Sequence, residues 1–243
     1  GYNMLDIGCG GGILAESATR LGACVTGVDA SPDNIRVASV HAARDPSLHL
    51  REREEDQVPG SLAYLATSAE SLAGRKFDIV TAMEVVEHVN QPAEFLRCLA
   101  SLIKPGGHLF LSTMSRTVFS YFLTIFLAED MLRVVTPGTH RHSQYIHPFE
   151  IVDFFRSIGW IPGERDVLAN RPLLPNGTPI APLPPRLQYE TRGTMYVPGL
   201  GRWILVPPSA VPKNSSSWLP SCLGGGMRPT ELCNYFFWVR RPW

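Results

Sequence analysis

A glycine-rich segment near the start of the chain constrains its fold more than any other feature: Asp6-Ile7-Gly8-Cys9-Gly10-Gly11-Gly12. It follows the apolar run Tyr2–Ile7, which has the composition of a strand, and precedes Ile13–Leu21, which has the pattern of a helix. Glycine lets the backbone turn sharply and lets a ligand approach without a Cβ in the way. The segment therefore predicts a strand, a tight ligand-facing turn and a helix in succession.

The alternation of strands and helices continues to about residue 114, which predicts an α/β fold with a doubly wound, mostly parallel sheet. A helix is expected to begin at Ser31-Pro32, where serine caps and proline fills the first turn. The further expected elements are the strands Cys24–Val28, Tyr64–Thr67, Phe77–Met83 and His108–Thr113, and the helix Pro92–Ile103, ended by Lys104-Pro105-Gly106-Gly107.

The pattern changes after Thr113, where a nearly all-apolar stretch covers Val118–Leu127 and a helical pattern covers Phe149–Ile158. Residues 172–229 are rich in Pro, Gly and Ser, which predicts loops and an insertion around Pro207–Pro229. An aromatic strand, Asn234–Arg240, closes the chain. We expect a single domain over residues 1–243, trimmed at its N-terminus, with a decorated C-terminal third at about 170–230.

Composition limits the classes of function. The 22 basic and 22 acidic residues cancel, which argues against nucleic acid as the main partner. The five cysteines are scattered without C-x-x-C spacing, so we expect neither a disulfide framework nor a structural zinc site. No apolar run reaches the length of a membrane-spanning helix, and the charged run 51–56 has the composition of a solvated loop.

Two sequence patterns of nucleotide-type binding sites contain a glycine turn of this sort. The dinucleotide pattern G-x-G-x-x-G/A, counted from Gly8, requires a small residue where the chain has Ile13. Asp6 and the additional glycines fit the form D-x-G-x-G-x-G instead. Asp29 ends the second predicted strand, where a carboxylate accepts hydrogen bonds from ribose hydroxyls; the alternative is a helix cap.

The ends of the next two strands supply further candidates. Glu70 follows the predicted strand Tyr64–Thr67, at a position where an acidic or backbone group commonly meets an adenine edge. Met83 ends Phe77–Met83 and could cover the adenine face, or simply pack in the core.

The sequence resembles the ubiquinone-biosynthesis O-methyltransferase family of class I S-adenosylmethionine-dependent methyltransferases, closer to its mitochondrial branch. The resemblance covers residues 4 to about 160 and rests on five segments: Leu5–Glu16, Val25–Asp29, Met83–Val89, Lys104–Gly107 and Pro137–His140.

This resemblance implies a seven-stranded Rossmann-like sheet and methyl transfer from S-adenosylmethionine to a hydroxyl of a polyprenylated catechol. The family's cofactor contacts carry over to Gly8, Asp29 and Met83, and we add Asp6, Gly10 and Glu70 as candidates. A family arginine upstream of the first strand has no counterpart here. The resemblance also implies the matrix face of the mitochondrial inner membrane, or alternatively the bacterial cytoplasm, with peripheral membrane contact and a multi-enzyme ubiquinone-biosynthesis complex as partners.

A reaction centre is expected directly after Met83. Glu84, Glu87 and His88 would share one face if this segment is helical. Two carboxylates and an imidazole suit a hard divalent ion, and the resemblance implies Mg²⁺ at these three residues. Two alternatives stay open: His88, or Glu87, as a base without metal, and a purely structural role.

Two further segments each allow two interpretations, so the sequence does not determine the substrate. His140, His142, Tyr145 and His147 would line a substrate pocket or form a solvated loop. The segment Thr117–Leu127 would lie in a membrane interface or pack as a buried helix. Rival functions are methylation of a soluble small phenol and a non-catalytic assembly subunit.

Overall fold

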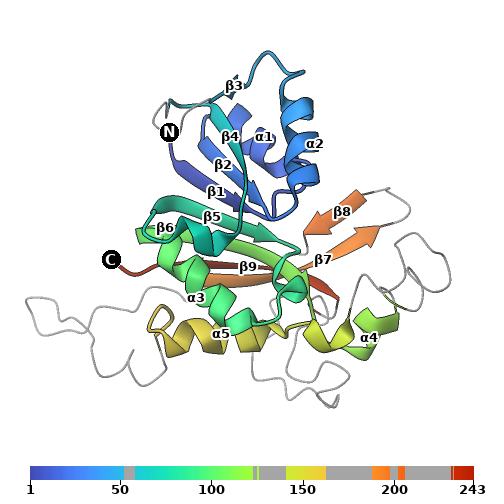
Figure 1. Cartoon of the computed structure of the whole chain (residues 1–243). Coiled ribbons are helices and arrows are strands. Elements are labelled where there is room, and N and C mark those ends of the chain that lie inside the picture. The colour runs from blue at the N-terminus through green and yellow to red at the C-terminus, as the bar shows by residue number, and fades with distance from the viewer. Residues whose placement is uncertain are drawn as a thin grey trace, which may run out of the picture. The chain divides into compact units, whose positions relative to one another are not determined.

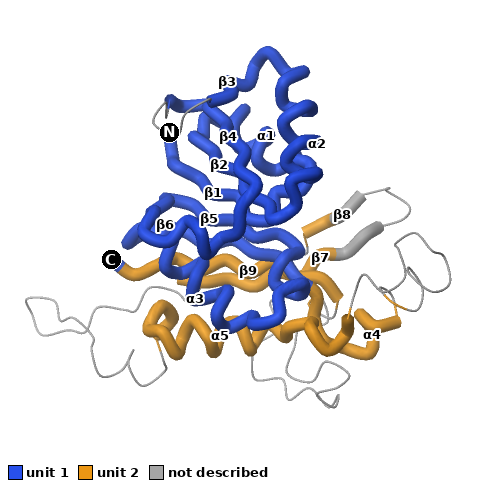
Figure 2. The backbone as a smooth tube through the Cα atoms, in the orientation of Figure 1, with its two compact units in different colours: residues 1–113, 243 blue, residues 114–242 orange. Residues whose placement is uncertain are grey.

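The computed structural model describes residues 1–51, 58–122, 125, 141–162, 188–197, 202–205, 231 and 233–243. The chain divides into two compact units, residues 1–113 with Trp243, and residues 114–242 (Figure 2). Compact units of this kind can belong to one domain, so the single domain over residues 1–243 stays a prediction.

The first unit contains a parallel sheet with the strand order β3-β4-β2-β1-β5-β6 (Figure 1). The chain starts in the middle of this sheet, builds outward on one side of β1, and then returns to place β5 on the other side. The pair β1 and β5 is therefore the topological switch point, where ligands bind in open α/β sheets. The strands are β1 Asn3–Ile7, β2 Cys24–Asp29, β3 His49–Leu50, β4 Ser61–Ala66, β5 Phe77–Met83 and β6 Ile103–Met114.

Helices follow these strands, as expected of crossover connections. Helices α1 (Ile13–Arg20) and α2 (Pro32–Ala42) contact β2 and β4, whereas α3 (Pro92–Leu102) contacts β5. Two 3₁₀ helices, η1 (Ala69–Leu72) and η2 (Val86–His88), follow β4 and β5. Helix α2 begins as predicted, because the Ser31 hydroxyl accepts the amide N–H of Asn34 at 3.4 Å.

The core of the first unit lies against both faces of the sheet, so its strands are apolar along most of their length. Leu5, Val25 and Leu62, from three adjacent strands, are fully buried. Burying one such side chain contributes about 1.5–3 kcal/mol to folding. This packing fixes the ends of the strands, from which the loops of the candidate site project.

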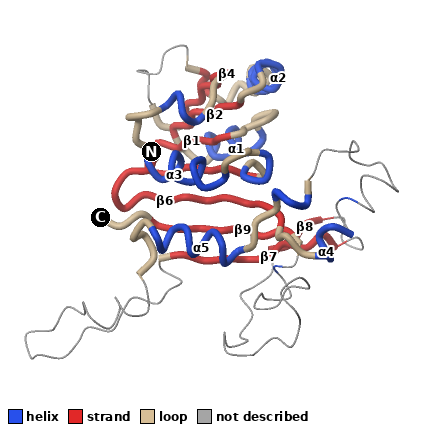
Figure 3. Tube along the Cα trace, turned by 60° about the horizontal axis from the view of Figure 1, so that its bottom comes forward, coloured by secondary structure: helices blue, strands red, loops and turns tan. Residues whose placement is uncertain are grey.

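The second unit contains three antiparallel strands, with β7 between β8 and β9 (Figure 3). Its elements are α4 Val118–Ser120, η4 His142–Gln144, α5 Pro148–Ser157, β7 Tyr189–Val197, β8 Arg202–Leu205 and β9 Asn234–Arg240. Helix α5 packs on β9 through aromatic rings, since Phe155 stacks on Phe237 with centroids 5.4 Å apart. The Tyr235 hydroxyl donates a hydrogen bond to the Ile146 carbonyl at 2.8 Å.

The fold class is confirmed, and the predicted bounds of β5 and β9 agree with the structure. The described residues contain nine strands rather than seven. Two short strands account for the difference: the two-residue strand β3, which the sequence did not predict, and β8, which pairs with β7.

Three predicted boundaries were wrong. The loop prediction for 172–229 missed β7 and β8, because a proline-rich composition hid two strands. The last strand of the first unit begins at Ile103 rather than His108, since Gly106, with φ +75°, lets the Lys104–Gly107 turn continue the strand after a register shift. The strand expected at Tyr64–Thr67 is Ser61–Ala66. Within the apolar segment Thr117–Leu127, α4 covers Val118–Ser120, and several of the later residues lie outside the described parts of the chain.

Several predicted features lie outside the described residues: His140, residues 52–56 of the charged run 51–56, and the insertion around Pro207–Pro229. Among the helices that the structure describes, none has the length and hydropathy required to cross a membrane.

Candidate functional site

Two loops meet at the switch point of the sheet, the glycine loop after β1 and the acidic loop after β5. Their strands are in register, with Ile7 paired to Ala82. A Cβ placed on Gly8 would lie 2.4 Å from Cγ2 of Val85, and Gly8 has φ +68°. Only glycine fits there, because a side chain would separate the loops. The two segments that the sequence proposed for cofactor and reaction centre therefore touch each other.

The glycine loop is held by backbone hydrogen bonds at its edges and is open in its middle. The amide N–H groups of Gly8 and Cys9 both donate to the Val28 carbonyl, at 2.8 and 3.0 Å. A Cβ on Gly10 or Gly11 would meet no protein atom within 4 Å. The middle of the loop can thus be approached closely by a ligand, as the sequence predicts.

Asp29 connects this loop to the start of α2. Its Oδ2 accepts the amide N–H of Gly10 at 3.0 Å, and its Oδ1 accepts the amide N–H of Ser31 at 2.8 Å. Asn34 adds a side-chain hydrogen bond to Oδ1 at 3.2 Å. The carboxylate therefore orders the first residues of α2 and also holds the glycine loop, whereas its contact with a ribose stays a prediction.

Asp6 is a buried acid at the same switch point, with 2% of its surface exposed. The Thr81 hydroxyl donates to Asp6 Oδ1 at 2.6 Å, whereas Oδ2 is buried with no hydrogen-bond partner in the described structure. Burial raises the pKa of Asp6 to about 6, against the lowering effect of Thr81. Burial, Asp6 and Asp29 also raise the pKa of Cys9 to about 12, so its thiol stays protonated and is no nucleophile.

The other two cofactor candidates occupy the strand ends that the sequence assigned to them. Met83 ends β5 half-buried, paired in register with Ser112 of β6. Glu70 is exposed on η1, just after the segment in which the Thr67 amide donates to the Asp29 carbonyl at 3.0 Å. Their contacts to a ligand stay predictions.

The segment after Met83 is not the helix that the i, i+3, i+4 spacing assumed. Glu84 has φ +53°, in the left-handed region, and only Val86–His88 forms a short 3₁₀ helix. Glu84 and His88 are exposed, whereas Glu87 is 2% exposed. In the described parts of the chain, no three His, Cys, Asp or Glu side chains are grouped to hold a metal ion.

The two carboxylates of this loop are nevertheless close enough to influence each other. Burial, followed by the charge of Glu84, raises the pKa of Glu87 to about 8. The Thr113 hydroxyl donates to Glu87 Oε2 at 2.9 Å, while Oε1 is buried with no hydrogen-bond partner in the described residues. The Ser112 hydroxyl donates to Glu84 Oε1 at 2.6 Å. A strained, left-handed residue beside a buried acid is typical of a functional site.

Sequence reasoning missed the residues that hold these carboxylates. Thr81, Ser112 and Thr113 are buried hydroxyl residues near the ends of β5 and β6. A signal was present, because polar residues inside otherwise apolar strands need a hydrogen-bond partner.

The histidine-rich segment lies in the second unit. His142 Nε2 is 2.9 Å from the Thr117 carbonyl, and the His147 ring stacks on Phe149 with centroids 5.0 Å apart. Tyr145 is buried at 1% exposure. A substrate pocket lined by these residues stays a prediction.

Comparison with known proteins identifies the class. A family model described as "Methyltransferase domain" matches residues 1–161, and the chain belongs to this methyltransferase family. Within it the chain belongs with the ubiquinone biosynthesis O-methyltransferases. It is 49% identical over 162 residues to the mitochondrial one of Schizosaccharomyces pombe, covering 66% of this chain and 56% of the relative. It is 39% identical over 176 residues to that of Ralstonia nicotianae, covering 71% and 68%.

The chain thus spans little more than half the length of the yeast relative. A solved structure of a SAM-dependent methyltransferase from Methanosarcina mazei has a TM-score of 0.54 at 16% identity, covering 99% of this chain and 92% of that one. This likeness supports the fold.

Replacing Asp29 with alanine should weaken binding of S-adenosylhomocysteine, the demethylated form of the cofactor. The substitution removes a charged acceptor for the ribose and releases Gly10, and we expect a loss of about 1.5–3 kcal/mol. Titration calorimetry measures the dissociation constant. Asp33→Ala is the matched control, because Asp33 is an exposed carboxylate on α2 whose side chain is 85% exposed. Equal affinity of wild type and Asp29→Ala would remove Asp29 from the cofactor site.

Proposed function

We propose that this chain transfers a methyl group from S-adenosylmethionine to a catechol hydroxyl of a polyprenylated ubiquinone precursor. The observation that carries the proposal is the contact of Gly8 with Val85, which sets the Glu84/Glu87 carboxylate pair beside the glycine loop. Membership in the family of ubiquinone biosynthesis O-methyltransferases supports the choice of acceptor.

Methyl transfer requires two contributions from the protein: alignment of the acceptor oxygen with the methyl group, and removal of the acceptor's proton. Alignment lowers the barrier by several kcal/mol, about 7–11 in the best oriented systems. A base works best when its pKa is near the working pH. In the absence of a bound metal ion, Glu87, with its pKa raised to about 8, meets this condition and can accept the catechol proton. His88 is the alternative base.

Two of the three predicted metal ligands, Glu84 and Glu87, have the chemistry to bind a divalent cation. Glu84 and Glu87 are carboxylates, the donors that Mg²⁺ prefers, and buried Oε1 of Glu87 has no hydrogen-bond partner in the described part of the chain. When bound, Mg²⁺ would lower the pKa of the catechol hydroxyl. Glu84 and Glu87 would hold it, while His88 is exposed on η2 and remains a predicted ligand without support from the geometry.

Methyl transfer to a panel of catechols tests the proposal and separates the rival functions. We expect transfer of a labelled methyl group, with kcat/KM rising when the catechol carries a prenyl tail. Equal kcat/KM with and without a tail would indicate a soluble phenol as substrate. No binding of S-adenosylhomocysteine would indicate the non-catalytic assembly subunit and overturn the proposal.

The proposed location is the matrix face of the mitochondrial inner membrane, with a multi-enzyme ubiquinone-biosynthesis complex as partner. The support is that the 49% identical relative is named mitochondrial, whereas a 39% identical relative is bacterial. A prenyl tail that stays in lipid also requires the enzyme to work at a membrane surface.

An apolar turn in the second unit supports such contact, because the four large side chains Val118, Phe119, Tyr121 and Phe122 are 44–52% exposed. Wild type should float with liposomes, and Phe119→Glu/Phe122→Glu should float several-fold less, since charges oppose burial in the interface. Phe149→Glu is the matched control, because Phe149 is a 50% exposed phenylalanine on α5. Equal flotation of all three proteins would contradict membrane contact through this turn.

A further inference from the structure

The side chain of Tyr64 fills a slot that two glycines leave open. Tyr64 lies on β4 and is paired in register with Gly27 of β2. A Cβ on Gly27 would lie 2.7 Å from Cδ1 and Cε1 of the tyrosine ring, and a Cβ on Gly12 would lie 2.1 Å from its hydroxyl oxygen. Both glycines are therefore required for the ring to occupy this place.

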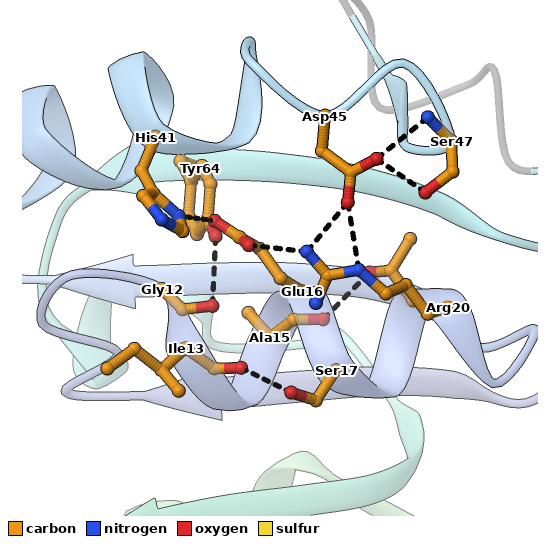
Figure 4. A network of polar contacts seen from close by, with 11 residues as sticks. Gly12, Ile13, Ala15, Glu16, Ser17, Arg20, His41, Asp45, Ser47 and Tyr64 are labelled. Atoms are coloured by element: carbon orange, nitrogen blue, oxygen red, sulfur yellow. Dashed lines mark hydrogen bonds and ion pairs between the residues drawn. The ribbon is translucent and has the colours of Figure 1, made fainter.

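The hydroxyl of Tyr64 contacts the glycine loop at the start of α1. It donates a hydrogen bond to the Gly12 carbonyl at 3.3 Å, which also accepts the amide N–H of Glu16 at 2.9 Å (Figure 4). Gly12 has φ +84°, so the chain turns into α1 at this residue. Burial and the charge of Glu16 raise the pKa of Tyr64, which keeps the hydroxyl protonated and able to donate.

A network of polar contacts around the buried carboxylate of Glu16 fixes α1 near the same contact. Glu16, 1% exposed, accepts from Arg20 Nη2 at 3.0 Å, and its Oε1 lies 2.6 Å from His41 Nδ1 of α2 (Figure 4). Arg20 also pairs with Asp45 at 2.7 Å, beyond the end of α2. The network connects α1 to α2 and to the turn that follows α2. It therefore fixes the position of α1, while Tyr64 fixes the glycine loop that precedes α1.

The loop is thus held at both ends and open in the middle. Gly8 packs on Val85, Gly12 packs on Tyr64, and Gly10 and Gly11 have no protein atom within 4 Å of an added Cβ. A loop already in its ligand-binding shape costs less ordering free energy when the ligand arrives.

We propose that Tyr64 is a positioning residue for the cofactor, which acts through the Gly12 carbonyl to hold the glycine loop in its binding conformation. This inference rests on the proposed function, since the ligand is the cofactor of methyl transfer. Tyr64 itself need not touch the cofactor.

Calorimetry with S-adenosylhomocysteine tests the proposal on variants of Tyr64 and Gly27. Tyr64→Phe keeps the ring and removes one neutral hydrogen bond, so we expect about three- to tenfold weaker binding. Gly27→Ala should weaken binding by at least a similar factor, because its Cβ would displace the ring and would also lie 3.2 Å from Sγ of Cys9 in the glycine loop. Adding Gly27→Ala to Tyr64→Ala should cause a smaller loss than Gly27→Ala causes in the wild type, because the clash with the ring is gone and only the contact with Cys9 Sγ remains.

Tyr2→Phe is the matched control, because Tyr2 is 67% exposed and should bind as wild type does. Positioning also predicts that Tyr64→Phe raises KM for S-adenosylmethionine while KM for the catechol and the melting temperature stay near wild-type values. Binding of Tyr64→Phe within twofold of wild type, or equal loss of cofactor and catechol affinity, would overturn it. A wild type that does not bind S-adenosylhomocysteine would instead overturn the proposed function, on which this inference depends.

Discussion

Replacing Asp6 with asparagine is expected to stabilise the protein more at pH 7 than at pH 4, by about 2 kcal/mol. The reason is the cost of ionising a buried acid. The pKa of Asp6 is 3.8 in the absence of burial and about 6 in the folded protein. A difference of about two pKa units corresponds to about 3 kcal/mol.

The sign follows from where the proton is bound. Below about pH 3.8 Asp6 is protonated in both folded and unfolded chains, so it contributes no pH dependence. Between pH 3.8 and about 6 only the unfolded chain loses the proton, so the free energy of unfolding falls as pH rises. Above about pH 6 the loss is complete. The Asp6→Asn variant has an uncharged amide at this position and would not show this fall.

Urea unfolding at pH 4 and pH 7 measures the effect, with Asp33→Asn as control for an exposed aspartate. The difference between wild type and Asp6→Asn should change by about 2 kcal/mol between the two pH values, and by more than the difference for Asp33→Asn, because the Asp33 side chain is 85% exposed. A constant difference for Asp6→Asn would show that Asp6 ionises without cost. Proteins retain such unfavourable groups mainly where function needs them, so this variant should also bind S-adenosylhomocysteine more weakly.

Local patterns were sufficient to predict much of the fold. The apolar run Phe77–Met83 is bounded by residues that end strands, and its predicted bounds match β5. Ser31 and Pro32 mark the start of α2 because capping depends on neighbouring residues only. The glycine loop and Asp29 were found in the same way, and the structure places Asp29 on Gly10 at 3.0 Å.

Features that depend on contacts distant in sequence could not be predicted. Gly27 lies in the middle of a strand, and its need for glycine arises from the ring of Tyr64, 37 residues later by the printed numbering. Glu84 is left-handed, although the spacing of the acidic residues fits a helix, because its amide N–H donates to the Ser112 carbonyl at 3.1 Å. In both cases tertiary packing overrides the local preference.

We expect removal of divalent metal to reduce turnover at least about 100-fold. This is the lower end of the rate loss expected when the group that handles the acceptor's proton is removed. Glu84 and Glu87 place two carboxylates close together, and the charge of Glu84 is one cause of the raised pKa of Glu87. Mg²⁺ added back should restore activity. Affinity for S-adenosylhomocysteine should not change, because the glycine loop and Asp29 supply those contacts.

The variant that tests the same site is Glu87→Gln, which keeps the size of the side chain and an acceptor for the Thr113 hydroxyl. It should lose turnover at least about 100-fold and should not respond to Mg²⁺. Glu94→Gln is the matched control, because Glu94 is an exposed carboxylate on α3 paired with Arg97 at 2.7 Å. Full activity of the chelated wild type would contradict the metal site, and His88→Gln would then test the alternative base: if it alone abolishes turnover while Glu87→Gln stays active, proton removal belongs to His88.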